Sequence, residues 1–166
     1  MTAASMKKIP VQTILLSGLL VGTLDILAAF VDYYIATGKD PVTIPGIILK
    51  YIASGLFGKE AFAGGAIYIW LGLLLHYIIA FVFTFLFFWL YSRISLLSKS
   101  WVLTGVVYGL FIWCIMNLIV VPSSSAPHKP LSAMEFTKAL KSALILIVMI
   151  GLPLAFIAGR AKGKKE

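Results

Sequence analysis

Four long apolar runs constrain what this chain can fold into more than any other feature of its sequence. They cover about residues 11–35, 66–90, 101–121 and, with its more polar approach, 133–159. Each reaches the length of about 20 residues that an α-helix needs to cross the hydrocarbon core of a bilayer. Lipid offers no hydrogen-bond partner to a free backbone, so such runs form helices. The pattern predicts an all-α, polytopic membrane bundle with about four transmembrane helices.

The composition agrees with a single membrane domain covering residues 1–166. Apolar and aromatic residues make up 61% of the chain and charged residues only 12%, and a soluble domain of this size has too little interior to hide so much apolar surface. The net charge of +8 would also suit a protein that binds nucleic acid. The basic residues form no stripe with interleaved aromatics, so we expect the partners to be the lipid bilayer and its anionic headgroups.

The distribution of basic residues predicts the orientation. Three segments that alternate with the apolar runs carry basic residues and, apart from the terminal Glu166, no acid: Lys7, Lys8, Arg93, Lys99, Arg160, Lys162, Lys164 and Lys165. By the positive-inside rule, both termini and the short second loop are cytoplasmic. The first run is longer than the apolar region of a signal peptide and contains acidic residues, so we interpret it as a retained helix.

The two outer segments differ in character. Segment 37–65 contains the apolar stretch IPGIILKYIASGLFG, within 41–58, which is too short to span and is bounded by Pro and Gly. It predicts a short helix that lies in the interface or is re-entrant, and a lid over the helix ends is the alternative. Loop 122–132 is rich in Pro and Ser, and Ser132 with Glu135 has the spacing of a capping box that starts the fourth helix.

Two positions interrupt otherwise regular apolar runs. Gly151 and Pro153 fall inside the fourth run, where proline removes a backbone donor and predicts a kink, with a coordinating carbonyl as the alternative.

The single cysteine, Cys114, cannot form an intrachain disulfide, and we expect it to pack inside the bundle.

Small and acidic residues share one face of the first predicted helix. They recur at helical spacings, and the set is Gly18, Gly22, Asp25, Ala29 and Asp32. Gly18 and Gly22 have the spacing that lets two helices approach closely, and Gly105 and Gly109 repeat it in the third helix. These faces are predicted to pack, within one chain or between copies. In the second case, a substitution such as Gly18→Leu would break a homo-oligomer.

Polar residues within the spans define a candidate intramembrane site. Asp25 lies near the middle of the first run and His76 at a similar depth in the second, so the two can pair if their helices face each other. Such a pair can shuttle protons, and the alternative is an interhelical hydrogen bond that only fixes packing. Asn117 would extend this patch, and Asp32 lies nearer the outer surface, where water can solvate it.

Enzyme motifs are missing from the sequence. It contains no phosphate-binding loop, no HExxH, no GxSxG, and no Cys and His cluster at metal-ligand spacing. We therefore predict no catalytic residue, no cofactor and no metal. Asp25 and Asp32 are two helical turns apart, about 10 Å, which is too far for both to bind one ion.

The stretches GLLLHYIIAFVFTFLFFWLYSRI and LTGVVYGLFIWCIMNLIVVPSSSAP resemble YagU-like inner-membrane proteins, a bacterial family with no assigned molecular activity. The shared layout is a helix with an early His, a short basic loop, a glycine-containing helix and a proline exit. The resemblance covers the second and third runs and departs in segment 37–65 and in the C-terminal tail. It implies a bacterial inner membrane and a link to acid tolerance, and it assigns no functional residues.

Two hypotheses of function follow. In the first, Asp25, His76 and Asn117 form a site that moves or senses protons or a small solute, with an assembly of several copies needed for transport. In the second, the protein is a structural or accessory component whose glycine faces bind other helices.

Overall fold

The computed structural model describes residues 9–128 and 135–163, and their regular structure is helical throughout. The α-helices are α1 (Val11–Thr37), α2 (Ile44–Phe57), α3 (Glu60–Ala63), α4 (Ile67–Arg93), α5 (Trp101–Ile115), α6 (Phe136–Leu146) and α7 (Leu152–Gly163). A 3₁₀ turn, η1 (Ser95–Ser98), and two π-helical turns, η2 (Met116–Val120) and η4 (Ile147–Gly151), join or extend them. The predicted all-α class is confirmed.

Four helices of the described chain are long and apolar enough to cross a membrane. They are Val11–Thr37, Ile67–Arg93, Trp101–Val120 and Phe136–Ala161, close to the four predicted runs. Large apolar side chains on their outer faces stay exposed, for example Trp70, Leu74 and Ile78 at successive turns of α4. Exposed apolar stripes of this length suit contact with lipid, and the protein has the architecture of a multi-pass membrane protein.

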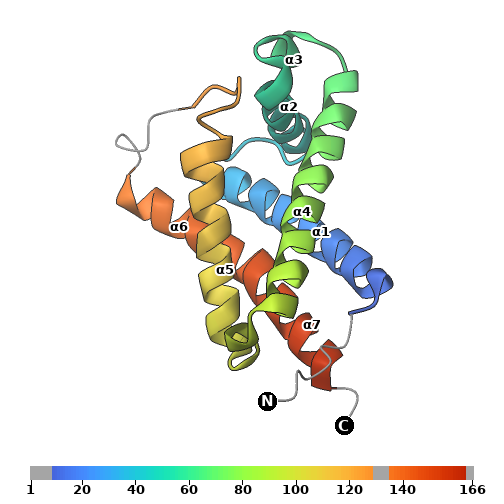
Figure 1. Ribbon diagram of the computed structural model, residues 1–166. Coiled ribbons are helices and arrows are strands. Elements are labelled where there is room, and N and C mark those ends of the chain that lie inside the picture. Colours follow the sequence, from blue (N-terminus) through green and yellow to red (C-terminus); the bar gives the residue numbers. More distant parts are fainter. Residues whose placement is uncertain (1–8, 129–134, 164–166) are drawn as a thin grey trace.

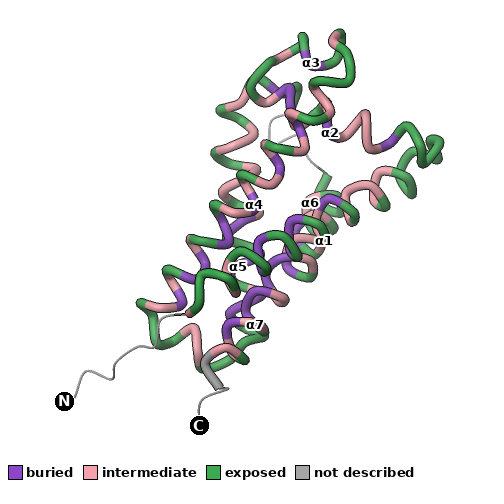
Figure 2. The backbone as a smooth tube through the Cα atoms, turned by 90° about the vertical axis from the view of Figure 1, so that its right-hand side faces the viewer, coloured by how far each residue is buried: buried purple, intermediate pink, exposed green. Residues whose placement is uncertain are grey.

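The helices form a bundle with two distinct ends (Figure 1). One end holds the beginning of α1, η1 and the end of α7. Ile9, which precedes α1, packs in one apolar cluster with Leu97 of η1 and Ala158 of α7. The other end carries α2, α3 and the segment that follows η2. Figure 2 shows buried residues concentrated on the sides of α4, α5 and α7 that face one another. The aromatic centre of this core is Phe87, which is fully buried and lies 4.8 Å, centroid to centroid, from Tyr108.

The fourth span, Phe136–Ala161, is helical without a break. After α6, the turn η4 widens to π-helical geometry, with the Leu152 N–H bonded to the carbonyl of Ile147, and α7 follows directly. Gly151 is the last residue of η4 and Pro153 the second residue of α7. A wider turn just before a proline accommodates the missing N–H donor without unwinding the helix.

The capping interpretation at the start of this span needs correction. Ser132 lies outside the described residues, whereas Glu135 occupies the N-cap position of α6 and not the third helical position. Its backbone is extended (φ −64°, ψ 135°), and its carboxylate pairs with Lys138 Nζ at 2.9 Å. A carboxylate near a helix N-terminus interacts favourably with the helix dipole, which explains this placement.

The predicted outer segment 37–65 folds as α2 and α3. α2 packs along the outer half of α4, where its Leu49 carbonyl rests against Gly72. The segment after η2 is fastened to α2, because Ser125 N donates to the Gly55 carbonyl (2.9 Å) and Tyr51 Oη donates to the Pro127 carbonyl (3.0 Å). The two outer segments thus form one cap on this end of the bundle.

The expectation for Cys114 was wrong. Its side chain is exposed on α5, whereas the same helix buries Tyr108 and Ile112. The helical rotation that points the glycines and Tyr108 inward turns Cys114 outward, toward the surface that lipid would cover.

Candidate functional site

The predicted small-residue stripe of α1 faces α4. A Cβ atom at Gly18 would lie 2.5 Å from the ring of Phe81, and one at Gly22 would lie 3.1 Å from the Cβ of Ala80. Because glycine has no side chain, the backbones of α1 and α4 can come this close. Gly18 therefore packs within its own chain, and Gly18→Leu would test the fold of one copy and not the assembly of several.

The side chain of His76 is buried in this α1–α4 contact. Its Nε2 lies 2.8 Å from the carbonyl oxygen of Gly22, and its ring meets that of Tyr77 edge to face at 5.5 Å. Tyr77 in turn shares a 2.8 Å hydrogen bond with the hydroxyl of Thr23. A carbonyl oxygen can only accept, so Nε2 must carry the proton. The ring nitrogen outside this bond is Nδ1.

Asp25 lies about one helical turn beyond Gly22 on the same stripe. Its side chain is half-buried, and it interacts electrostatically with His76. Within the described chain, no hydrogen bond or ion pair engages its carboxylate. The structure thus brings the two predicted residues near each other, but the direct partner of His76 is a backbone carbonyl of α1.

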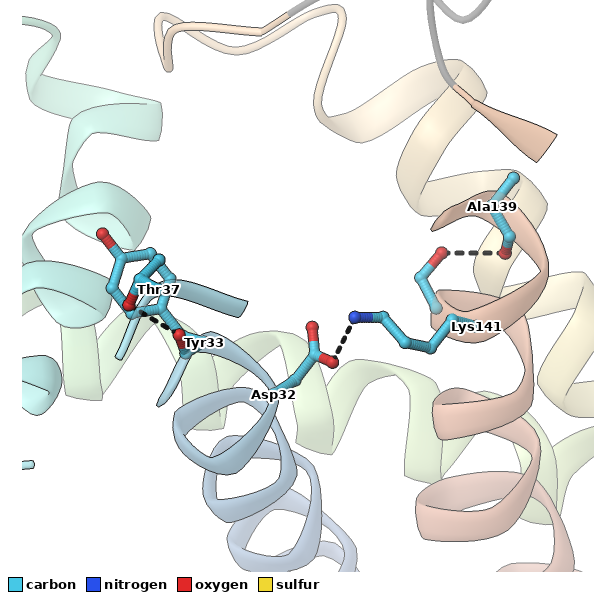
Figure 3. A network of polar contacts seen from close by, with 6 residues as sticks. Asp32, Tyr33, Thr37, Ala139 and Lys141 are labelled. Carbon is cyan, nitrogen blue, oxygen red and sulfur yellow. Dashed lines mark hydrogen bonds and ion pairs between the residues drawn. The ribbon is translucent and has the colours of Figure 1, made fainter. Parts of the chain in front are cut away.

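Asp32, two turns further along α1, makes an ion pair that sequence reasoning did not anticipate. Its Oδ1 lies 2.6 Å from Lys141 Nζ of α6, and Figure 3 shows the two groups pointing toward each other across the gap between the helices. The side chain of Asp32 is 34% exposed and that of Lys141 is 50% exposed. Both residues lie about one and a half turns inside the outer ends of their helices, and this matched depth was the signal available in the sequence.

We expect the Asp32–Lys141 pair to contribute about 0.2–1 kcal/mol to the free energy of unfolding, since both groups are partly solvated. The coupling can be measured with a double-mutant cycle of Asp32→Asn and Lys141→Gln by denaturant unfolding in detergent. It should fall as salt is raised. Additive single substitutions at low salt would show that the pair contributes nothing.

Asn117 belongs to a different contact. Its Nδ2 donates to the carbonyl of Trp113 (2.9 Å) at the junction of α5 and η2. The indole of Trp113 donates to Ser142 Oγ (2.8 Å), and Ser142 donates to the carbonyl of Ala139 (2.9 Å). The described hydrogen bond of Asn117 thus lies within its own helical stretch, whereas the Trp113–Ser142 bond joins α5 to α6, and neither involves Asp25 or His76.

The second pair of predicted packing glycines joins α5 to the fourth span. A Cβ atom at Gly105 would lie 2.8 Å from Leu152 Cα, and one at Gly109 would lie 2.5 Å from Ile147 Cα. Gly151 faces them from the other side, directly against the Gly105 carbonyl. The glycine faces of α1 and α5 are thus both filled by helices of the same chain, which leaves neither free for the helix of a partner.

The candidate site is therefore a carboxylate within electrostatic range of a buried imidazole, between two membrane-length helices, with the Asp32–Lys141 ion pair nearer the capped end. In the described residues, no group of three or more His, Cys, Asp and Glu side chains is arranged to hold a metal ion. Comparison with protein-family models, curated proteins and solved structures finds no match to this chain. Its chemistry is accordingly interpreted from its own geometry.

Proposed function

We propose that this multi-pass membrane protein takes up and releases protons at an intramembrane site formed by Asp25 and His76. The observation that carries the proposal is a half-buried carboxylate on α1 that lies within electrostatic range of a buried imidazole on α4 and has no hydrogen bond in the described chain. An ionised carboxylate at such depth is costly unless it is paired or wet, and membrane proteins retain such groups mostly for function.

The bond of His76 to α1 favours proton exchange over simple packing. Because Nε2–H is held by the Gly22 carbonyl, the ring keeps its position whether or not Nδ1 is protonated. Asp25 and His76 can then share one proton, either as two neutral groups or as an ion pair, with the same net charge in both states. Sharing avoids an isolated charge in the low-dielectric interior.

We propose further that the protein resides in a bacterial inner membrane with both termini in the cytoplasm. The positive-inside rule supports this orientation, because the end of the bundle that holds η1 and the end of α7 exposes Arg93, Lys99 and Arg160. The cap of α2 and α3 would then face the periplasm, and the Asp32–Lys141 pair would lie between that side and Asp25.

Proton flux tests the proposal directly. We expect liposomes that contain the wild-type protein and an internal pH dye to pass protons faster than protein-free liposomes under an imposed potential. Asp25→Asn removes the titratable carboxylate and His76→Ala the imidazole, so each should reduce the flux to the protein-free level.

The matched control is Glu60→Gln, which neutralises an exposed carboxylate of α3 outside the spans and should leave the flux unchanged. Circular dichroism and unfolding temperature confirm that each variant is folded. Wild-type flux at the background level, or full flux in folded Asp25→Asn, would refute a proton-handling role for this pair.

A further inference from the structure

At the capped end of the bundle, two basic side chains of α6 have acidic partners within the chain. Lys138 pairs with Glu135 at 2.9 Å, and Lys141 pairs with Asp32 at 2.6 Å. These pairs neutralise much of the positive charge that α6 carries at this end. Lys138 and Lys141 are therefore poorly placed to attract an external anion.

The opposite end, which holds η1 and the end of α7, is different. Arg93, Lys99 and Arg160 are all exposed there. The acidic residues of the described chain lie within α1 or at the capped end: Asp25, Asp32, Asp40, Glu60 and Glu135. The described part of this end is thus a positive surface with no acidic residue of the described chain beside it, and such a surface favours an anionic partner.

Aromatic rings next to Arg93 and Arg160 position the two guanidinium groups relative to the membrane surface. Arg93 lies 5.9 Å from the ring centroid of Trp89, and Arg160 lies 4.6 Å from that of Phe156. Phe156 itself packs edge to face on Trp101 at 5.5 Å. Trp89 and Trp101 are exposed, and exposed tryptophans at the ends of spans settle at the level of the lipid headgroups. Each arginine is thereby held where lipid phosphates lie.

We propose that Arg93 and Arg160 bind the phosphate groups of anionic phospholipids. A guanidinium offers parallel N–H donors that match two phosphate oxygens, and its stacking on a ring limits the side-chain entropy lost on binding. Lys99 adds a further positive charge on the same end. A zwitterionic headgroup brings its own cation and gains less from this surface. The inference is independent of the proton site, which lies elsewhere in the bundle.

Native mass spectrometry of the detergent-solubilised full chain can measure this preference. We expect phosphatidylglycerol to bind more tightly than phosphatidylcholine, with an affinity that falls as salt is raised. Arg93→Gln and Arg160→Gln should each raise the Kd for phosphatidylglycerol about fivefold, the effect of removing one basic residue at an anionic surface. Arg93→Lys and Arg160→Lys should lose less, because they keep the charge.

The matched control is Lys39→Gln, since Lys39 also lies 5.9 Å from an aromatic ring, that of Tyr33, but at the capped end. It should leave the Kd for phosphatidylglycerol unchanged. Unfolding temperatures in lipid-free detergent show that the variants are folded. The proposal is overturned if a folded protein with both Arg93→Gln and Arg160→Gln keeps the wild-type preference for phosphatidylglycerol, or if Lys39→Gln lowers that preference equally. Displacement of the lipid by inorganic phosphate at the same concentration would also overturn it.

Discussion

Replacing Gly151 with leucine is expected to lower the free energy of unfolding by about 3 kcal/mol or more, at the upper end of the cost of overpacking. A Cβ atom at this position would overlap the carbonyl of Gly105 and would lie 3.0 Å from the backbone nitrogen of Gly109. These neighbours are backbone atoms of α5, so no side-chain rotation can make room. The fourth span would have to separate from α5 along the contact.

Reversible unfolding in mixed detergent micelles, followed by circular dichroism, measures this cost. Gly159→Leu is the matched control, because Gly159 lies in the same helix and a Cβ atom there has no neighbour within 4 Å. It should change the unfolding free energy by less than about 0.5 kcal/mol, as surface substitutions do. Equal effects at Gly151 and Gly159 would show that the backbones of α5 and η4 do not approach as closely as the structure indicates.

Gly72→Val is expected to release α2 from α4. The Gly72 position faces the backbone carbonyl of Leu49 so closely that any side chain would overlap it. The overlap should cost about 1–3 kcal/mol, which corresponds to an increase of about tenfold or more in the population of opened α2. The cap formed by α2 and the segment after η2 would open with it.

Thiol labelling can detect this opening. In a Cys114→Ser background, Ala53→Cys places a reporter at a position of α2 that is fully buried, and its labelling rate should rise about tenfold in Gly72→Val. Gly65→Val is the control, since Gly65 lies just before α4 and has open space around its Cβ position. Labelling that is fast already in the otherwise wild-type protein, or unchanged in Gly72→Val, would contradict the docking of α2.

Some of the fold could be predicted because it depends on local properties of the chain. Apolar length decided where the spans lie, since a bilayer sets the number of residues a helix needs. Helical periodicity likewise showed that Gly18, Gly22 and Asp25 share one face of α1, and that this face points at protein. The start of α6 was misplaced because a capping box and a single N-cap carboxylate differ only in where the helical backbone begins, and Glu135 fits both patterns.

The candidate site was only partly predictable. The sequence indicated that Asp25 and His76 lie at similar depth in the membrane, because depth follows from counting residues inward from the ends of each span. The hydrogen bond of His76 to the Gly22 carbonyl depends on how far α4 is rotated about its axis and on how closely it approaches α1. Asn117 was predicted to extend this polar patch, but its side chain donates to the carbonyl of Trp113 in its own helical stretch.

The sequence by itself determined that lipid surrounds most of this protein, where its four spans lie and which helix faces carry small and polar residues. These features were predictable because hydrophobicity and helical periodicity are properties of neighbouring residues. Only the tertiary structure decided which face meets which. Asp32 meets Lys141, and Gly105 meets Gly151, across more than forty residues of chain in each case. Which residues meet depends on the position of each helix along the bundle and on its rotation about its own axis. Close backbone contacts at a few glycines determine both, and no local sequence pattern contains this information.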